Sequence, residues 1–173
     1  MVIGIFAMTL VLVGLDQWIK MWASDYLQSV GTIPLIDGVF HLKYVENRGA
    51  VAGILQGKQI FLIVVTAVIL LALAAALLLK KVPGKILPWC FGLFIGGGIG
   101  NLIDRIFLGY VVDYLDFRLI HYPVFNFADC CVVVGVFAFA IYVVFFEGKT
   151  AAAPAVSEED SAEESESNEE QAQ

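Results

Sequence analysis

The sequence predicts an all-α polytopic membrane protein in which four transmembrane helices carry a small extracytoplasmic β-sheet, or cradle. Two observations lead to this fold class. The chain has 173 residues, of which 60% are hydrophobic, whereas soluble domains average about 45–50% apolar residues. The apolar residues are also concentrated in four runs of roughly 20 residues, the length that a helix needs to cross a bilayer.

The four apolar runs define the expected spans. The first is uncharged until Asp16. It is not a typical cleaved signal peptide, because it lacks a basic segment before the apolar core and a small-x-small site after it. The second run carries no charge at all. We expect the spans to cover Val2–Trp22, Ile60–Leu79, Ile86–Ile103 and Phe127–Phe146.

Basic residues gather beside the ends of three of these spans. Lys80, Lys81 and Lys85 occupy the short turn between the second and third spans, and Lys149 follows the fourth. Because basic residues mark the cytoplasmic side of short loops, we expect both termini in the cytoplasm. The longer outer segments carry basic residues that are more widely spread, namely Lys43, Arg48, Lys58 and Arg118.

The net charge of −7 comes from the C-terminal segment. Residues 150–173 contain eight acidic residues and neither a basic nor an aromatic one, so they cannot bury enough apolar surface to order themselves. We therefore expect a membrane domain at residues 1–149 and a disordered acidic cytoplasmic tail at residues 150–173. The body is close to neutral, and we expect no nucleic-acid partner.

Two segments between the spans, residues 23–59 and 108–125, are predicted to face outward. Residues 40–45 alternate apolar and polar side chains, as a half-buried strand does, and residues 110–112 are also strand-like. A small sheet lying on the bilayer is the expected result. Turns are predicted at Gly31, Pro34 and Gly38.

Two aspartates stand where the outer segments meet the membrane. Asp113 follows the strand-like residues of the second segment, and Asp129 lies in the first turn of the last span, just after Asn126. Ionisable residues in such places are costly and by default functional. Two carboxylates that converge can activate a water molecule by acid–base chemistry. The predicted loop also contains Asp116, and the local pattern does not say whether Asp113 or Asp116 is the catalytic one.

Other polar residues cluster near the same membrane boundary. Asp16 and Lys20 are one helical turn apart, so we expect an ion pair that also positions neighbouring polar groups or lipid. The third span closes with Asn101, Asp104 and Arg105. We expect Asp104 and Arg105 to pair with other groups and anchor the helix end, and the deeper amide of Asn101 must find partners. Residues 47–50 look like a turn. The glycines at 92, 96 and 100, with two more at 97 and 98, predict close helix packing.

Several other chemistries are poorly supported. Outside the tail, the only serines are Ser24 and Ser29, and neither is deep in a span, as a serine intramembrane protease requires. His41 and His121 lie far apart and no HExxH motif occurs, which disfavours a zinc protease. We expect no metal and no cofactor, and we interpret Cys90, Cys130 and Cys131 as small buried hydrophobic residues. The alternatives are an ion-coupled membrane carrier that uses the same aspartates as relay sites, and a structural subunit.

The ordered polar blocks resemble those of the lipoprotein signal peptidases, or signal peptidase II. The resemblance spans nearly all of residues 1–149, and five blocks in order on a four-span chain are highly specific. The family often reads Asn-x-Gly-Ala-Ala-Phe in the second block, and this chain departs from it at Val51 and Ala52, which concerns the flap over the site. The blocks are Asp16 with Lys20, residues 47–50, residues 100–105, residues 109–113 and residues 125–129.

The resemblance implies a bacterial inner-membrane aspartic endopeptidase with its active site at the outer face. Such an enzyme removes the signal peptide from a diacylglyceryl-modified prolipoprotein and cuts just before the lipidated cysteine. The resemblance assigns the catalytic dyad to Asp113 and Asp129 and leaves Asp116 out. Asp16 and Lys20 fall on a pair that shapes the site. The positions that line or support it are Asn47, Gly49, Asn101, Arg105 and Asn126.

The resemblance also implies the partners and suggests a mechanism. The cyclic peptide globomycin should bind at the dyad, membrane lipid should surround the protein, and we expect a monomer. One carboxyl should be neutral and the other ionised, because like charges in a low-dielectric site cannot both ionise cheaply. Asp129, nearer the hydrocarbon, is the expected neutral partner, although a helix N-terminus favours its charged form.

Overall fold

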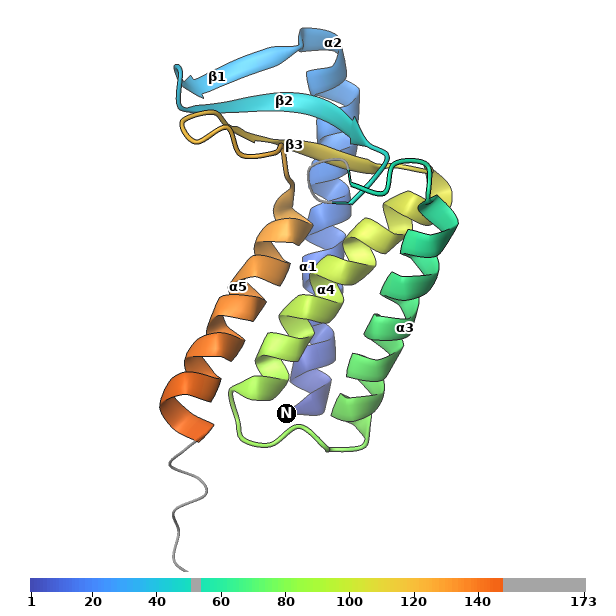
Figure 1. The fold of residues 1–173 in the computed structure, drawn as a ribbon, viewed down its shortest axis with the longest axis vertical. Helices are drawn as coiled ribbons and strands as arrows, with labels where there is room; N and C mark the ends of the chain where they lie inside the picture. Colours follow the sequence, from blue (N-terminus) through green and yellow to red (C-terminus); the bar gives the residue numbers. More distant parts are fainter. Residues whose placement is uncertain (51–53, 148–173) are drawn as a thin grey trace, which may run out of the picture. The chain divides into compact units, whose positions relative to one another are not determined.

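The computed structural model describes residues 1–50 and 54–147 (Figure 1), so the expected tail at residues 150–173 and the departures at Val51 and Ala52 lie outside the described residues. Residues 1–140 form one compact unit, and a second unit begins at Ile141. In the second unit the described residues are the end of the last helix and a π-helical turn. The elements are α1 (Val2–Trp22), a π-helical segment (Ala23–Leu27), α2 (Gln28–Val30), β1 (Thr32–Ile36), β2 (Phe40–Asn47), α3 (Gln59–Leu78), α4 (Leu87–Phe107), β3 (Val111–Phe117), α5 (Phe127–Tyr142) and the π-helical turn Val143–Glu147.

Within residues 1–50 and 54–147, four helices are long and apolar enough to cross a membrane, which confirms the predicted spans. All four begin within one residue of the predicted positions. The third was predicted to end at Ile103, but α4 continues to Phe107. The additional turn remains helical because Asp104 and Arg105 direct their polar groups to partners in the protein: Asp104 is buried beside Lys20, and Arg105 donates to the Asn101 carbonyl.

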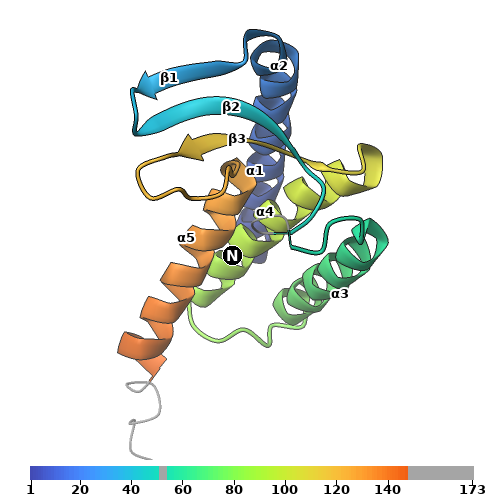
Figure 2. The same cartoon turned by 45° about the horizontal axis from the view of Figure 1, so that its top comes forward.

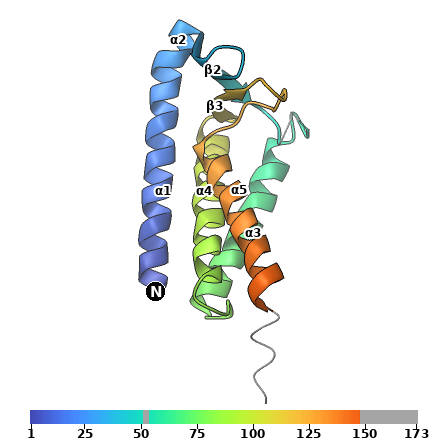
Figure 3. The ribbon, with the colours of Figure 1, turned by 90° about the vertical axis from the view of Figure 1, so that its left-hand side faces the viewer.

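Helix α4 lies between α1, α3 and α5, with α1 on one side and α5 and α3 on the other (Figures 1 and 3). Its glycines make this possible, because a Cβ atom at these positions would meet a neighbouring helix. Gly92 and Gly96 face α1, Gly97 faces the backbone of α5 at Ala128, and Gly98 faces α3. The predicted close packing through small residues is confirmed, and it extends to three helices instead of one.

The three strands form an antiparallel sheet in the order β1-β2-β3, which crosses one end of the helices (Figures 1 and 2). We call this the sheet end. The strand predicted at residues 40–45 is confirmed, and the one predicted at residues 110–112 is confirmed from Val111, where β3 begins. The prediction that residues 113–117 form a loop is wrong: they belong to β3 and pair with β2 as far as Phe40 opposite Phe117.

The turn predicted at Pro34 is also wrong, because Pro34 lies within β1. Strand β1 pairs only with β2 and is therefore an edge strand, where the missing N–H of a proline is tolerated. Gly31 and Gly38 do mark the ends of β1, and both have positive φ angles, which glycine adopts without strain.

Candidate active site

Asp113 and Asp129 line one cavity of about 180 Å³ at the sheet end. Strand β3 supplies Asp113, and the first turn of α5 supplies Asp129. The two residues are 16 positions apart in sequence and reach the cavity from different elements. The other lining residues are Asn47, Ala50, Asn101, Arg105, Val111, Tyr122, Pro123, Val124, Phe125, Val132 and Val133.

Asp113 is held in place by two amides. Its side chain is 2% exposed. Asn126 Nδ2 donates to Asp113 Oδ1 at 2.7 Å, and Asn47 Nδ2 donates to Asp113 Oδ2 at 2.9 Å. Burial, followed by the neighbouring Asp129 carboxylate, raises the pKa of Asp113 to about 7, although both amides oppose the shift. The carboxyl can therefore carry a proton near neutral pH.

Asp129 belongs to a capping box at the start of α5. Asn126 Oδ1 accepts the backbone N–H of Asp129 at 3.0 Å, and Asp129 Oδ2 accepts the backbone N–H of Asn126 at 3.1 Å. This reciprocal pair satisfies two N–H groups that a helix start otherwise leaves free. The same local motif that begins the helix thus fixes the orientation of Asp129 toward the cavity.

The amide of Asn101 connects the carboxyl groups to α1. Asn101 Nδ2 donates to Asp129 Oδ1 at 2.8 Å. Asn101 Oδ1 accepts from Lys20 Nζ at 2.8 Å and from Asn126 Nδ2 at 3.0 Å. Since the Lys20 ammonium can only donate, this contact fixes the Asn101 amide with its NH₂ group toward Asp129.

Lys20 lies in a buried ion triad. Its ammonium is 2.8 Å from Asp16 Oδ2 and 3.0 Å from Asp104 Oδ2, and all three side chains are at most 3% exposed. The predicted pair of Asp16 and Lys20 is confirmed, but it is not satisfied within one helix, because Asp104 of α4 shares the cation. Gln17 Nε2 donates to Asp104 Oδ1 at 3.0 Å and to the Gly100 carbonyl at 3.1 Å.

The turn after β2 brings the last predicted residues to the cavity. Asn47 Oδ1 accepts the backbone N–H of Gly49 at 3.0 Å, which confirms the predicted turn and directs the Asn47 NH₂ toward Asp113. Arg105 donates to the carbonyls of Gly49 and Asn101, both at 3.3 Å. Its buried Nε has no hydrogen-bond partner among the described residues.

Comparison with known proteins shows to which family this chain belongs. The sequence model described as signal peptidase (SPase) II matches residues 8–145. The lipoprotein signal peptidase of Clostridioides difficile strain 630 is 48% identical over 146 residues, covering 82% of this chain and 95% of that protein. The chain belongs to the signal peptidase II family. Brevibacillus brevis has a lipoprotein signal peptidase that is 43% identical over 141 residues, covering 80% of this chain and 93% of that protein.

Solved structures agree with the fold. A bacterial membrane enzyme determined by the in meso method at 2.3 Å resolution superposes with a TM-score of 0.79 at 26% identity and covers 88% of this chain and 94% of that chain. A second one, at 1.9 Å resolution, gives a TM-score of 0.73 at 28% identity over 83% and 94% of the two chains. This signal peptidase II family member is therefore a multi-pass membrane peptidase, and the comparisons give no support to an ion-coupled carrier.

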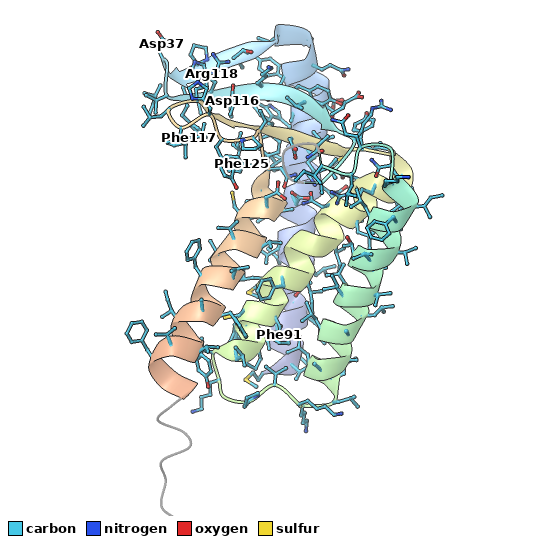
Figure 4. All side chains as sticks on the ribbon, in the orientation of Figure 1. Asp37, Phe91, Asp116, Phe117, Arg118 and Phe125 are labelled. Atoms are coloured by element: carbon cyan, nitrogen blue, oxygen red, sulfur yellow. The ribbon has the colours of Figure 1, made fainter. Side chains whose placement is uncertain are left out.

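Asp116, the alternative candidate to Asp113, lies on the same strand but away from the cavity. Its carboxylate pairs with Arg118 at 2.8 Å, and both residues lie near Asp37, on the side where β1 ends and β2 begins (Figure 4). His41 is opposite Asp116 on β2, as expected for a residue on a strand face. His121 is exposed in the loop after β3. In this signal peptidase II chain, Asp116 does not line the cavity that contains Asp113.

Sequence reasoning missed three residues of the site. Asp104 was expected to pair with unspecified groups and anchor a helix end, and its partner is Lys20 of the ion triad. Gln17 bridges Asp104 and Gly100, and the Tyr114 hydroxyl accepts the backbone N–H of Phe127 at 3.1 Å. The available signal was the three-residue spacing of Gln17 and Lys20 on α1, which places both side chains on the same face of the helix. Within residues 1–50 and 54–147, no group of three or more His, Cys, Asp and Glu side chains is placed to hold a metal ion.

Proposed function

We propose that this protein is an aspartic endopeptidase that removes the signal peptide from diacylglyceryl-modified prolipoproteins and cuts before the lipid-modified cysteine. The observation that carries the proposal is the placement of Asp113 and Asp129 on one cavity, with amide donors on both carboxyl groups. Membership of the signal peptidase II family and the names of the relatives supply the substrate class.

The lining of the cavity suits a lipidated peptide. Polar groups surround the carboxyls, while Val132 and Val133 on α5 and residues 123–125 supply apolar surface. Residues Val133 and Val134 are exposed on a helix that is apolar enough to span the bilayer. A peptide at the carboxyls can thus leave its acyl chains in hydrocarbon, where each buried CH₂ contributes about 0.8 kcal/mol.

The geometry favours Asp113 as the neutral carboxyl and Asp129 as the ionised one, which is the reverse of the expectation from the sequence. Asp113 is fully buried, whereas Asp129 is half-buried. Asp129 also accepts a backbone N–H at the start of α5, where the helix dipole favours an anion. The raised pKa of Asp113, about 7, agrees with this division of roles.

The reaction then follows the chemistry of a carboxyl pair that shares one proton. The Asp129 carboxylate takes a proton from a water molecule, and the water oxygen attacks the scissile carbonyl carbon. Asp113 gives its proton to the carbonyl oxygen, which yields a neutral tetrahedral intermediate. The intermediate collapses when Asp129 passes its proton to the departing nitrogen, the C–N bond breaks, and a hydroxyl proton returns to Asp113.

The surrounding groups support this cycle. Asn47 and Asn126 hold the Asp113 carboxyl, and Asn101 and Asn126 hold the Asp129 carboxyl. We assign Arg105 to the substrate, because its guanidinium lines the cavity, makes only long contacts to carbonyls and keeps Nε unpartnered among the described residues. An Arg donor there can hold a backbone carbonyl of the bound peptide.

The proposal includes the cellular setting. Lys80, Lys81 and Lys85 lie at the turn between α3 and α4, at the opposite end of the helices from the sheet. The positive-inside rule then puts both termini in the cytoplasm of a bacterium and the cavity at the outer face of the inner membrane. We further propose that the enzyme acts as a monomer surrounded by membrane lipid, and that globomycin competes for the cavity.

Purified protein and a synthetic diacylglyceryl prolipoprotein peptide provide the test. Replacement of one acid–base group should lower kcat by roughly 10²–10⁴-fold, so Asp113→Asn and Asp129→Asn should each lose cleavage while the proteins remain folded. Persistent cleavage at the wild-type rate in either variant would disprove the dyad. Inhibition by globomycin separates a peptidase from a carrier.

A further inference from the structure

The ion triad of Asp16, Lys20 and Asp104 does more than neutralise buried charge. Asp16 Oδ1 accepts the backbone N–H of Ala128 at 3.0 Å, and Asp104 Oδ2 accepts the backbone N–H of Val112 at 3.0 Å. Ala128 is the residue immediately before Asp129, and Val112 is the residue immediately before Asp113. Each acid of the triad thus holds the main chain directly beside one of the two active-site aspartates.

Lys20 joins these two contacts into one unit. Its ammonium bridges Asp16 and Asp104 at 2.8 and 3.0 Å. The same ammonium donates to Asn101, whose NH₂ group holds the Asp129 carboxyl. The Lys20 ammonium is therefore connected to the Asp129 carboxyl through the Asn101 side chain. Through Asp16 and Asp104 it is also connected to the main chain of α5 and of β3.

We propose that Asp16, Lys20 and Asp104 are positioning residues that set the separation of the Asp113 and Asp129 carboxyl groups through the main chain of β3 and α5. The inference rests on the proposed dyad and identifies the residues that keep its two carboxyl groups at the separation that catalysis needs. Water activation between two carboxyls depends on their separation, and a misplacement of 1 Å can cost about 10²-fold in rate.

The surroundings of the triad support this role over simple charge balance. A buried ion pair is weak by itself as a source of stability, because desolvation offsets the attraction. Gly100 leaves room for the Asp16 carboxylate, since a Cβ atom there would collide with it. Ala128 is fully buried and Val112 is 1% exposed, so water cannot replace either contact with a backbone N–H.

Because charged groups surround Asp113, changes in the triad should also change the pKa of Asp113. Lys20 from α1, Asp104 and Arg105 from α4, and Asp129 from α5 act on the cavity, and the nearest β2 side chain, Asn47, is neutral. Lys20 lowers the pKa of Asp113. Loss of the cation by itself therefore raises that pKa, whereas a wider separation from the Asp129 carboxylate by itself lowers it.

The experiment compares paired substitutions in the full-length protein, assayed with the diacylglyceryl prolipoprotein peptide. Asp104→Leu and Asp16→Leu remove an acceptor, whereas Asp104→Asn and Asp16→Asn retain an oxygen for the backbone N–H. The Leu variants should lose about 100-fold in kcat with KM changed by less than about threefold. The Asn variants should recover at least about tenfold of that loss. Asp37→Asn, at a side chain that is 100% exposed, is the matched control and should behave as wild type.

Lys20→Met should lose kcat like the Leu variants, and the alkaline limb of its kcat profile should move, because the cation and the Asp129 carboxylate both act on the pKa of Asp113. Folded Leu variants with wild-type kcat, or an unmoved alkaline limb in Lys20→Met, would overturn the inference. If the Leu variants do not fold, the double variant Lys20→Met/Asp16→Asn decides, because it removes the bridge and retains both backbone acceptors. It should lose at least about tenfold in kcat at unchanged KM, and wild-type kcat would overturn the inference. Active Asp113→Asn or Asp129→Asn would instead disprove the proposed function itself.

Discussion

Helix α4 contacts its neighbours through two different kinds of surface. Along residues 92–98 its glycines admit apolar side chains and the backbone of other helices, and packing there depends on size. From Gly100 toward the sheet, charged and amide side chains hydrogen-bond between α4 and its neighbours. Packing along residues 92–98 depends on side-chain size, whereas packing from Gly100 toward the sheet depends on hydrogen bonds and charge. Different substitutions should therefore disrupt the two regions.

The largest effect is expected from overfilling the glycine region. In Gly97→Val, the new side chain would collide with the Ala128 carbonyl and with Val132. Overpacking typically costs about 1–3 kcal/mol, and here it also separates α4 from the turn that carries Asp129. We expect a lower Tm in detergent together with loss of cleavage.

Gly14→Ala is the matched control for this substitution. No atom lies within 4 Å of a Cβ at Gly14, and alanine favours a helix over glycine by about 1 kcal/mol. The control should keep or raise Tm. A Gly97→Val protein with unchanged Tm would show that the glycine region does not depend on size.

In the polar region, Asn126→Asp tests the donor role of this amide. Aspartate can still accept the Asp129 N–H and cap α5, but its carboxylate cannot donate to Asp113 or Asn101, as Asn126 does. We expect a loss of roughly 10²-fold in kcat, since a member of the proposed dyad loses its orienting donor, and a lower Tm, since Asn126 is fully buried and a third carboxylate there is costly.

Asn126→Leu, which removes the cap but buries no charge, supplies the comparison, and loss of the cap should cost about 1–2 kcal/mol. Thermal unfolding and initial cleavage rates measure both quantities. Full activity in Asn126→Asp would contradict the role assigned to this amide.

A smaller, graded effect should appear in the wild-type pH profile. The pKa of Asp113 is raised to about 7, and the proposed mechanism needs this carboxyl protonated. The proton is present below that pKa and is lost above it, so kcat should fall about tenfold per pH unit on the alkaline side. Rates between pH 5 and 9 with one lipopeptide test this. A kcat that stays constant up to pH 9 would exclude Asp113 as the proton donor.

Patterns in the sequence predicted the glycine region of α4 well and the polar region, from Gly100 toward the sheet, only in part. Helix spans follow from runs of apolar residues, and the glycine spacing predicted a packing face without reference to a partner. The extension of α4 to Phe107 was missed because Asp104 and Arg105 look like a charged helix end. Their partners are Lys20 and a carbonyl after β2, and contacts across 84 and 56 positions leave no periodic pattern.

The strand at residues 113–117 was missed for a related reason. Asp113 and Asp116 gave the segment the polarity of a loop, yet both are buried. Asp113 finds amide partners on other elements, and Asp116 pairs with Arg118 two residues further along the chain. The assignment of Asp113 to the proposed dyad came from the family resemblance, since local physics treats Asp113 and Asp116 alike. Only the fold separates them: Asn47 and Asn126 reach Asp113, and Arg118 reaches Asp116.

The smallest effect is therefore expected at Asp116. Asp116→Asn removes a pair with Arg118, whose side chain is 43% exposed, and such pairs contribute about 0–1 kcal/mol. The carboxylate does not line the cavity, so kcat should change by less than about twofold while Asp113→Asn, three residues away on the same strand, loses cleavage. The two variants have the same change of charge and nearly the same place in the sequence. If Asp116→Asn were as inactive as Asp113→Asn, charge on β3 would matter more than the cavity, and the separation of the polar site from the rest of the sheet would be wrong.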